Sequence, residues 1–162
     1  MTRADLKKAL QQLSYGLYVV GSSTKDDRRV SILANWVSQV SFVPPLVAIS
    51  IEHGSTMHEA ILERRSFSVN VLPSGSPQMT RGFLKSHVTD TKSFNGWEFH
   101  LAGGGSPFLK DALSCFECTV HSATECGDHT LFVGEVVELE IHRNAPGLTL
   151  RETGLNYWKD PS

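Results

Sequence analysis

Short strand-like segments dominate the sequence after Gly16 and limit the folds that the chain can adopt. Eight runs are rich in Val, Ile and aromatic residues and are separated by Gly, Pro, Asp and Asn, a pattern typical of strands joined by turns. They are Leu17–Ser22, Val30–Leu33, Trp36–Phe42, Leu46–Ile51, Phe67–Leu72, Trp97–Leu101, Ser114–Ser122 and Leu131–Ile141. Strands at this spacing predict a mainly β barrel or sandwich.

Helical patterns occur at a few places around these strands. Apolar side chains at helical spacing in residues 6–13 follow the candidate N-cap Thr2, so we expect a first helix that packs one face on the body. Another helix is expected to begin at Ser76, with Pro77 in its first turn, and to run towards Lys85. The fold prediction is therefore mainly β with a few peripheral helices.

Composition narrows the class of protein. The length of 162 residues and the 40% apolar content predict a single domain over residues 1–162 that needs neither disulfides nor metal for its core. Lys and Arg number 15 against 17 Asp and Glu, which argues against a nucleic-acid partner. The charged start and the lack of a stretch near ~20 apolar residues predict a cytoplasmic protein without a membrane segment. The odd count of three cysteines indicates free thiols.

Each of three predicted strands has one more apolar face and one face of short polar side chains. The small polar positions are Asn35, Gln39 and Ser41 on the first strand, Ser50 on the second, and Ser68 and Asn70 on the third. They fit two interpretations. Either they are ordinary exposed positions of antiparallel strands, or they form a binding platform for a flat ligand with polar edges, such as a flavin or a nucleobase.

A helix start after Gly54 is a candidate phosphate site. Ser55 opens the segment, and Thr56 and Glu59 have the spacing of a capping box. Helix N-termini present unpaired N–H groups and a positive dipole end, although a plain N-cap explains the same residues. The usual dinucleotide and nucleoside-triphosphate motifs are absent from the sequence. Gly103–Gly105 lacks their context and is expected to be a flexible turn.

A cluster of cysteines and histidines raises a zinc hypothesis. Its members are Cys115, Cys118, His121, Cys126 and His129. In an extended strand Cys115 and His121 would share one face and Cys118 would point to the other, which argues against a shared metal. We therefore predict buried structural thiols and no metal site.

Six segments in one order make the chain similar to a known family, the flavin reductase-like, FMN-binding split-barrel proteins. The matching segments are Tyr15–Val20, Ala34–Pro45, Phe67–Leu72, Gly82–Lys85, Gly105–Pro107 and Glu125–His129. Within that family the chain most resembles the flavin reductase module of flavodiiron proteins and the flavoredoxin-like proteins. The resemblance implies a split β-barrel of Greek-key type and a homodimer that binds FMN near the subunit interface.

The same resemblance implies the residues of the site. His129, in a Gly-Asp-His motif, matches the histidine that lies near the flavin and the nicotinamide, so it is the candidate catalytic residue. The implied cofactor-binding residues are Asn35, Trp36, Val37, Ser38, Gln39, Ser50, Ile51, Ser55, Thr56, Phe83 and Lys85. Ser55 and Thr56 are expected at the phosphate end, and Phe83 to Lys85 are expected to close over the cofactor.

The activity that the resemblance implies is that of an NAD(P)H-dependent FMN reductase. A hydride would pass from NADH or NADPH to N5 of FMN, and electrons would then reach free flavin, ferric iron or a protein acceptor. The alternative is an FMN-binding electron carrier with little NAD(P)H activity of its own. A haem- or pyridoxal-linked split-barrel protein is a third hypothesis.

Overall fold

The computed structural model describes residues 1–158, so the last four residues of the predicted domain, 159–162, lie outside the described part. The strands are β1 (Tyr18–Ser23), β2 (Arg29–Ala34), β3 (Val37–Ser41), β4 (Leu46–Glu52), β5 (Ser66–Val71), β6 (His87–Thr89), β7 (Ser93–Phe94), β8 (Trp97–Leu101), β9 (Pro107–Leu109), β10 (Ser114–Cys126) and β11 (His129–Ile141). The helices are α1 (Arg3–Leu10), α2 (Thr56–Arg64), α3 (Pro77–Arg81) and α4 (Leu150–Thr153). All eight predicted strands are present.

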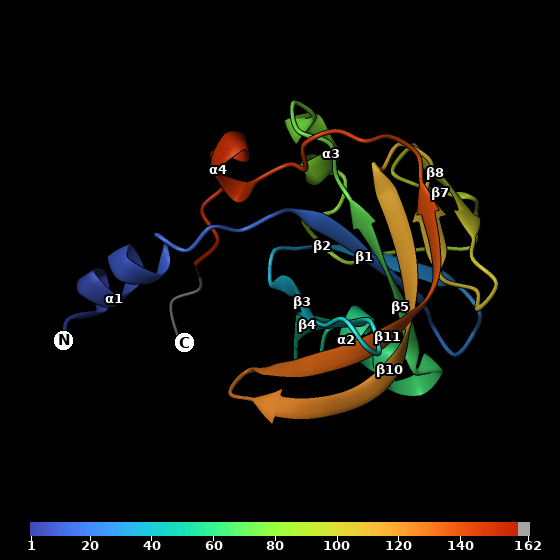
Figure 1. Cartoon of the computed structure of the whole chain (residues 1–162), viewed down its shortest axis with the longest axis horizontal. Coiled ribbons are helices and arrows are strands. Elements are labelled where there is room, and N and C mark those ends of the chain that lie inside the picture. The colour runs from blue at the N-terminus through green and yellow to red at the C-terminus, as the bar shows by residue number, and fades with distance from the viewer. Residues whose placement is uncertain (159–162) are drawn as a thin grey trace.

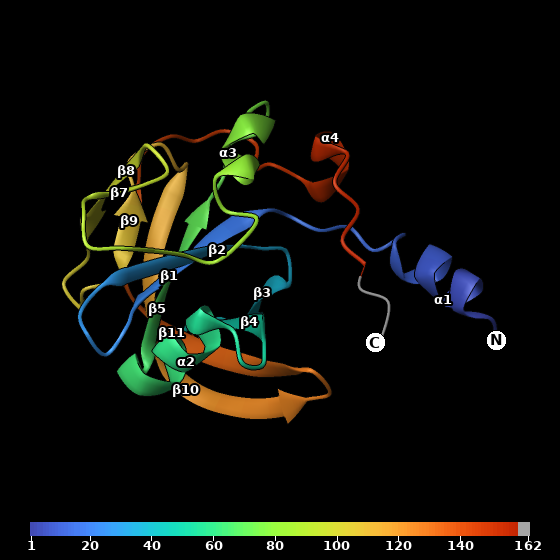
Figure 2. The ribbon, with the colours of Figure 1, turned by 180° about the vertical axis from the view of Figure 1, so that it is seen from behind.

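Eight of these strands form one antiparallel sheet, in the order β3-β4-β11-β10-β5-β1-β2-β6. The sheet curls into a barrel, and the small sheet β7-β8-β9 lies against it (Figures 1 and 2). Strands that are distant in the sequence lie side by side, β5 on β1 and β11 on β4, as Greek-key connections require. The structure confirms the predicted mainly β split-barrel fold with peripheral helices.

The β10–β11 hairpin bends across the barrel. Each strand has 13 residues, and their pairing shifts register between Glu117 and Cys118 and again between Val120 and Ser122. Bulges of this kind bend a strand and increase its local twist. The second shift makes His121 an extra residue of β10, so the alternation breaks there, and Cys115 is buried whereas His121 is exposed. The expectation that these two residues share a face was wrong for this reason.

The barrel interior and helix α2 share the first hydrophobic core. Met57, Ala60 and Ile61 are the buried residues of α2, and their helical spacing places them on one face. They pack in one cluster with Ile49 of β4 and Phe132 of β11. Helix α2 thus fixes the end of β4 and the start of β11, which matters for the site described below.

A second core lies between the main sheet and the strands β7 to β9. Phe94 and Phe99 stack with ring centroids 4.5 Å apart, and Phe83 and Phe108 are fully buried in the same cluster. Helix α3 contributes Met79 to this core. The helix ends at Arg81, so it stops short of the predicted Lys85.

A buried polar network joins the two cores. The Asn70 Nδ2 donates to the Val19 carbonyl at 3.0 Å, and its Oδ1 accepts from the Leu109 amide at 2.7 Å. The Ser68 hydroxyl donates to the Pro107 carbonyl at 2.6 Å. Since Asn70 is 1% exposed and Ser68 is 0% exposed, the predicted polar platform does not extend to β5. These two residues satisfy the backbone of β9 instead.

The glycine-rich segment 103–105 is anchored, which corrects the expectation of a flexible turn. The buried carboxylate of Glu117 accepts hydrogen bonds from the Gly104 amide at 2.8 Å and from the Ser106 amide at 3.0 Å. A Cβ atom on Gly104 would lie 2.5 Å from Glu117 Oε2. Glycine is therefore required at this position by the close approach of the carboxylate.

Helix α1 projects away from the barrel (Figure 1), although we expected one face of it to pack on the body. The Thr2 cap is confirmed, because its side chain accepts from the Asp5 amide, but no residue of the helix is buried. Leu10 and the following Leu13 are 43% and 55% exposed. The apolar side of the helix is therefore not buried by any part of residues 1–158. In residues 1–158, none of the helices combines the length and the apolar character that crossing a membrane requires.

We predict that Asn70→Leu destabilises the protein strongly. The substitution leaves the Leu109 amide and the Val19 carbonyl buried without this partner, and each such group costs about 1–3 kcal/mol. Chemical denaturation should show the loss as a lower midpoint. Asn144→Leu, at an exposed asparagine, is the control and should change the free energy of unfolding little. Equal effects of the two substitutions would contradict the role of the network.

Candidate functional site

Three strand ends meet at one corner of the barrel and bring the central predicted site residues together. The Ser50 amide of β4 donates to the Trp36 carbonyl, which precedes β3, at 3.1 Å. His129, the first residue of β11, pairs with Glu52 at the end of β4. The ring centroids of His129 and Trp36 lie 4.8 Å apart. The structure thus places the predicted catalytic histidine against the predicted cofactor-binding segment.

The turn before β11 determines how the His129 ring is held. Gly127 adopts φ +65°, a conformation that glycine allows at low cost, and it lets the hairpin close. The His129 side chain is 9% exposed, and its Nδ1 lies 2.6 Å from Oδ1 of Asp128. Because an ionised carboxylate only accepts, Nδ1 carries the proton of this hydrogen bond. In the neutral imidazole Nε2 is then an acceptor for a ligand donor.

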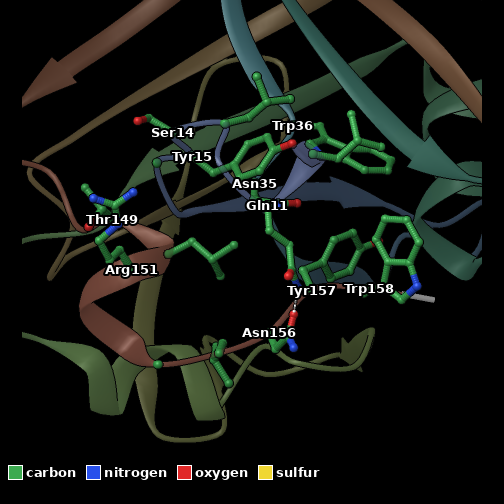
Figure 3. Close-up of a pocket in the computed structure, with 16 residues that line it drawn as sticks. Gln11, Ser14, Tyr15, Asn35, Trp36, Thr149, Arg151, Asn156, Tyr157 and Trp158 are labelled. Atoms are coloured by element: carbon green, nitrogen blue, oxygen red, sulfur yellow. Dashed lines mark hydrogen bonds between the residues drawn. The ribbon is translucent and has the colours of Figure 1, made fainter. Parts of the chain in front are cut away.

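A cleft of about 480 Å³ opens beside this corner, between α1 and the barrel (Figure 3). Its wall includes Tyr15, Asn35 and Trp36. Asn35 is 8% exposed, and its Nδ2 has no hydrogen-bond partner within residues 1–158. A buried donor without a partner costs about 1–3 kcal/mol. An unsatisfied amide in the wall of a cleft is therefore suited to an acceptor atom of a ligand.

The C-terminal segment forms the other wall of this cleft. The Tyr157 ring meets Trp36 edge-on, with centroids 5.5 Å apart. The Gln11 side chain donates to the Asn156 side chain, so the segment is tied to the residue that caps α1 (Figure 3). Sequence reasoning did not assign these residues to the site. The one signal in the sequence was the aromatic pair Tyr157–Trp158. No local pattern shows that this pair lies next to Trp36, which is far away in the sequence.

The N-terminus of α2 lies next to the same strand ends. Ser55, not Thr56, is the N-cap, and its hydroxyl accepts from the His58 amide at 3.2 Å. The predicted capping box between Thr56 and Glu59 was therefore wrong, because the cap lies one residue earlier and the third helical residue is His58. Ser55 also donates to the Glu52 carbonyl at 2.8 Å, which fixes the helix to the end of β4. Thr56 is exposed in the first turn.

The remaining predicted residues differ in what they expose. Ser38 and Gln39 lie exposed on the edge strand β3, and Lys85 is also exposed. Val37 packs in part against the first core, and Ile51 is 4% exposed within it. Phe83 is fully buried in the second core, so its side chain faces the core and not the surface. Its carbonyl accepts from the Leu33 amide at 2.7 Å and holds the segment near the end of β2.

The cysteines do not assemble with the histidines. Cys115 and Cys118 are buried in different cores, and Cys126 is exposed. Burial raises the pKa of the Cys115 and Cys118 thiols to about 12, so they stay protonated at neutral pH. Over residues 1–158, no three side chains of His, Cys, Asp or Glu are grouped as a metal would require.

Residues 10–160 match the model of the flavin reductase like domain family, so the chain belongs to this family. The resemblance drawn from the sequence is confirmed. The family defines the class of protein: the chain is a flavin reductase-like protein of a flavin-binding oxidoreductase family.

Individual relatives support this assignment. The diflavin flavoprotein A 1 of Synechocystis sp. is 34% identical over 147 residues, which are 90% of this chain and 25% of that protein. The ferric-chelate reductase (NAD(P)H) of Archaeoglobus fulgidus is 33% identical over 146 residues, which are 88% of this chain and 85% of that protein. The chain spans about a quarter of the length of the diflavin flavoproteins that it matches.

A solved structure shows the same fold. The NADH:FAD oxidoreductase SgcE6 of Streptomyces globisporus C-1027 matches with a TM-score of 0.82 and 26% identity. The match covers 98% of this chain and 94% of that one. The same protein has also been solved in complex with NAD and FAD fragments.

Proposed function

We propose that the chain is an NAD(P)H-dependent FMN reductase whose flavin binds at the corner formed by Asn35, Trp36 and His129. The unsatisfied Asn35 amide is the observation that carries this proposal. The carbonyl oxygens and ring nitrogens of a flavin are acceptors of the kind that this donor lacks. The family assignment and the reductases among the relatives support the same conclusion.

The residues around the corner fit the parts of FMN. Trp36 offers an aromatic surface beside the Asn35 donor, and the exposed Ser38 and Gln39 offer polar groups along β3. The N-terminus of α2, with Ser55 and Thr56, suits the phosphate because of its positive dipole end. When bound, the flavin supplies hydride acceptance at N5 and onward electron transfer.

The protein's own contribution is to place the nicotinamide. With Nδ1 bound to Asp128, Nε2 of His129 accepts a hydrogen bond from a carboxamide N–H₂ group. The Trp36 ring and the buried position of His129 limit water at this point. These residues act by orientation, so no nucleophile or acid–base pair of the chain is needed.

An electron carrier is the second candidate, and one observation favours it. The chain matches only a quarter of the diflavin flavoproteins, so a domain of this kind also occurs within larger proteins. Such a domain could receive electrons from, or pass them to, a protein partner. Steady-state oxidation of NADH and NADPH with added FMN separates the candidates, because rapid turnover supports the reductase and its absence supports the carrier.

We predict that Asn35→Ala weakens FMN binding about tenfold while the flavin-free protein keeps its stability. The loss of one desolvated hydrogen bond to the ligand corresponds to about tenfold in affinity. In the flavin-free protein the amide has no partner to lose within residues 1–158. Fluorescence titration with FMN and chemical denaturation of the flavin-free variant measure the two effects.

Ser31→Ala is the matched control for this prediction. The Ser31 hydroxyl is also buried without a partner in the described chain, but Ser31 does not line the cleft. The Ser31→Ala substitution should leave the affinity for FMN unchanged. Equal FMN affinity of Asn35→Ala and the wild type would remove Asn35 from the site.

We predict that His129→Ala slows the reduction of bound FMN by NADH or NADPH about tenfold to a hundredfold. One positioned hydrogen bond to the nicotinamide is lost, which raises the barrier by about 1–3 kcal/mol. Stopped-flow absorbance at saturating nicotinamide measures the rate. Reduction by dithionite is the control, since it bypasses the nicotinamide. A wild-type rate with both nicotinamides would make His129 a turn residue only.

We also propose that the functional unit is a homodimer. Val137, Leu139 and Ile141 alternate along β11 and are 59%, 60% and 73% exposed. Phe42 and Val43, after β3, are 85% and 92% exposed. Contiguous exposed apolar residues of this kind mark interaction surfaces. A second copy of the chain would cover them close to the proposed flavin site.

Light scattering should therefore give about twice the chain mass of 17.9 kDa. We predict that Leu139→Lys shifts the protein towards the monomer, because a charge would have to be buried in the interface. Leu62→Lys, at an exposed leucine of α2 with 44% exposure, is the control and should leave the dimer intact. A wild-type protein that stays monomeric with saturating FMN would exclude the dimer.

A further inference from the structure

Two histidines outside the proposed flavin corner converge on one buried hydroxyl. His53 Nε2 lies 3.0 Å from Thr130 Oγ1, and His58 Nε2 lies 2.8 Å from the same oxygen. The two imidazole centroids are 5.2 Å apart, and the His58 ring also contacts Phe132. Thr130 is 5% exposed. We call His53, His58 and Thr130 the hydroxyl cluster.

The hydroxyl cluster joins the three elements that form the proposed site. Thr130 is the second residue of β11 and directly follows His129. His53 directly follows β4, and its amide donates to the Asp128 carbonyl at 3.0 Å. His58 lies in the first turn of α2, where its amide donates to Ser55. Successive residues of a strand point to opposite faces, so the cluster lies behind the strand that carries His129.

Proton counting shows why both imidazoles can bind one hydroxyl. A threonine hydroxyl has one proton to donate and two lone pairs to accept with. With both imidazoles neutral, one Nε2 accepts the Thr130 proton and the other donates its own proton to Oγ1. With both imidazoles protonated, each Nε2–H must donate, so neither ring can accept the Thr130 proton. Two cations would then also lie 5.2 Å apart.

We propose that Thr130, His53 and His58 are positioning residues that hold His129 at a fixed place relative to the phosphate end of the flavin site. This proposal rests on the proposed function, because the position of His129 affects activity only where the flavin and the nicotinamide bind at this corner. The proposal goes beyond that function because the three side chains meet on the opposite face of the strand that carries His129. Their hydroxyl–imidazole contacts are the direct side-chain link from the first turn of α2 to the start of β11.

The charges around the cluster set the direction of its pH response. Desolvation and the neighbouring His53 lower the pKa of His58, while Glu59 on α2 and Glu125 on β10 act in the opposite direction. Glu52 at the end of β4 and Asp128 and His129 at the turn are the other ionisable groups close by. Because the pKa of His58 is lowered in the folded protein, its neutral form is favoured. The arrangement with one donating and one accepting imidazole is therefore complete above the ordinary imidazole pKa near 6.5, and it is lost as the pH falls through the lowered pKa of His58.

The test compares Thr130→Val with Thr130→Ser. Valine keeps the shape of threonine without the hydroxyl, whereas serine keeps the hydroxyl. In Thr130→Val the His53 amide should exchange with solvent about tenfold faster by NMR, and NADH should reduce bound FMN about tenfold more slowly. Thr130→Ser should restore both towards the wild type. Thr124→Val, at an exposed threonine of β10 whose hydroxyl has no hydrogen bond in the described chain, is the control.

A second variant tests the proton dependence. Glutamine carries a nitrogen and an oxygen near the position of Nε2 but does not titrate, so His58→Gln should keep the wild-type exchange rate at pH 7.5. Between pH 6.5 and 5.5 the protection of the His53 amide, corrected for intrinsic exchange, should fall in the wild type and not in His58→Gln.

The outcomes separate this proposal from the proposed function. Equal His53 exchange in Thr130→Val and wild type would overturn the positioning role, as would equal losses in the valine and serine variants. A wild-type protein that neither nicotinamide reduces would instead overturn the proposed function. The amide exchange of the flavin-free protein decides the role of the cluster in either case.

Discussion

The β10–β11 hairpin joins the two halves of the barrel through hydrogen bonds on both of its outer edges. β10 pairs with β5, and β11 pairs with β4. A flat hairpin could not reach both neighbours in a closed arrangement, and the two register shifts, one with its extra residue in β11 and one in β10, bend it. This bend also sets the site, because it brings the hairpin turn, and with it His129, back to the end of β4.

Buried polar groups are the second constraint, and the protein meets it in two different ways. In the body, Asn70 and Glu117 are placed so that their oxygens and nitrogens complete the hydrogen bonds of loops and short strands. At the corner, the Asn35 amide has no such partner in the described chain. The contrast is informative because all three residues are buried. Asn70, the other buried asparagine in residues 1–158, is satisfied by the protein, whereas Asn35 keeps a free donor for the flavin that we propose.

The sequence predicted the elements well where local pattern determines them. The strands and the apolar face of α2 follow from alternation and spacing, and the cap at Thr2 follows from residue type. The errors arose where tertiary contacts decide. Ser68 and Asn70 look like surface positions of β5, but the small sheet β7-β8-β9 covers them. The α1 helix has an apolar side that no part of the described chain covers.

The site was predictable only in part for the same reason. The residues at the ends of β3, β4 and β11 were identified because the family resemblance covers them. Their approach to Tyr15 and Tyr157 depends on how the two ends of the chain fold back, and no local pattern carries that information. The pairing of His53 and His58 on Thr130 is also a tertiary event, since Thr130 lies more than seventy residues from each histidine.

Several features that lack a partner in the described chain lie close together. The Asn35 amide, the aromatic cleft and the uncovered apolar side of α1 all lie near the start of β3, and the exposed Phe42 and Val43 follow the same strand. The hydroxyls of Ser31 and Ser106 are the other buried side-chain polar atoms without a partner in residues 1–158, and both can donate or accept. A folded chain gains nothing from leaving a donor and several large apolar side chains without partners, so their concentration in one region indicates what completes it. In the function that we propose, the flavin supplies acceptor atoms for the unsatisfied donor and a second copy of the chain covers the exposed apolar side chains. Since β3 borders both, binding of the flavin and association of two chains should be energetically coupled.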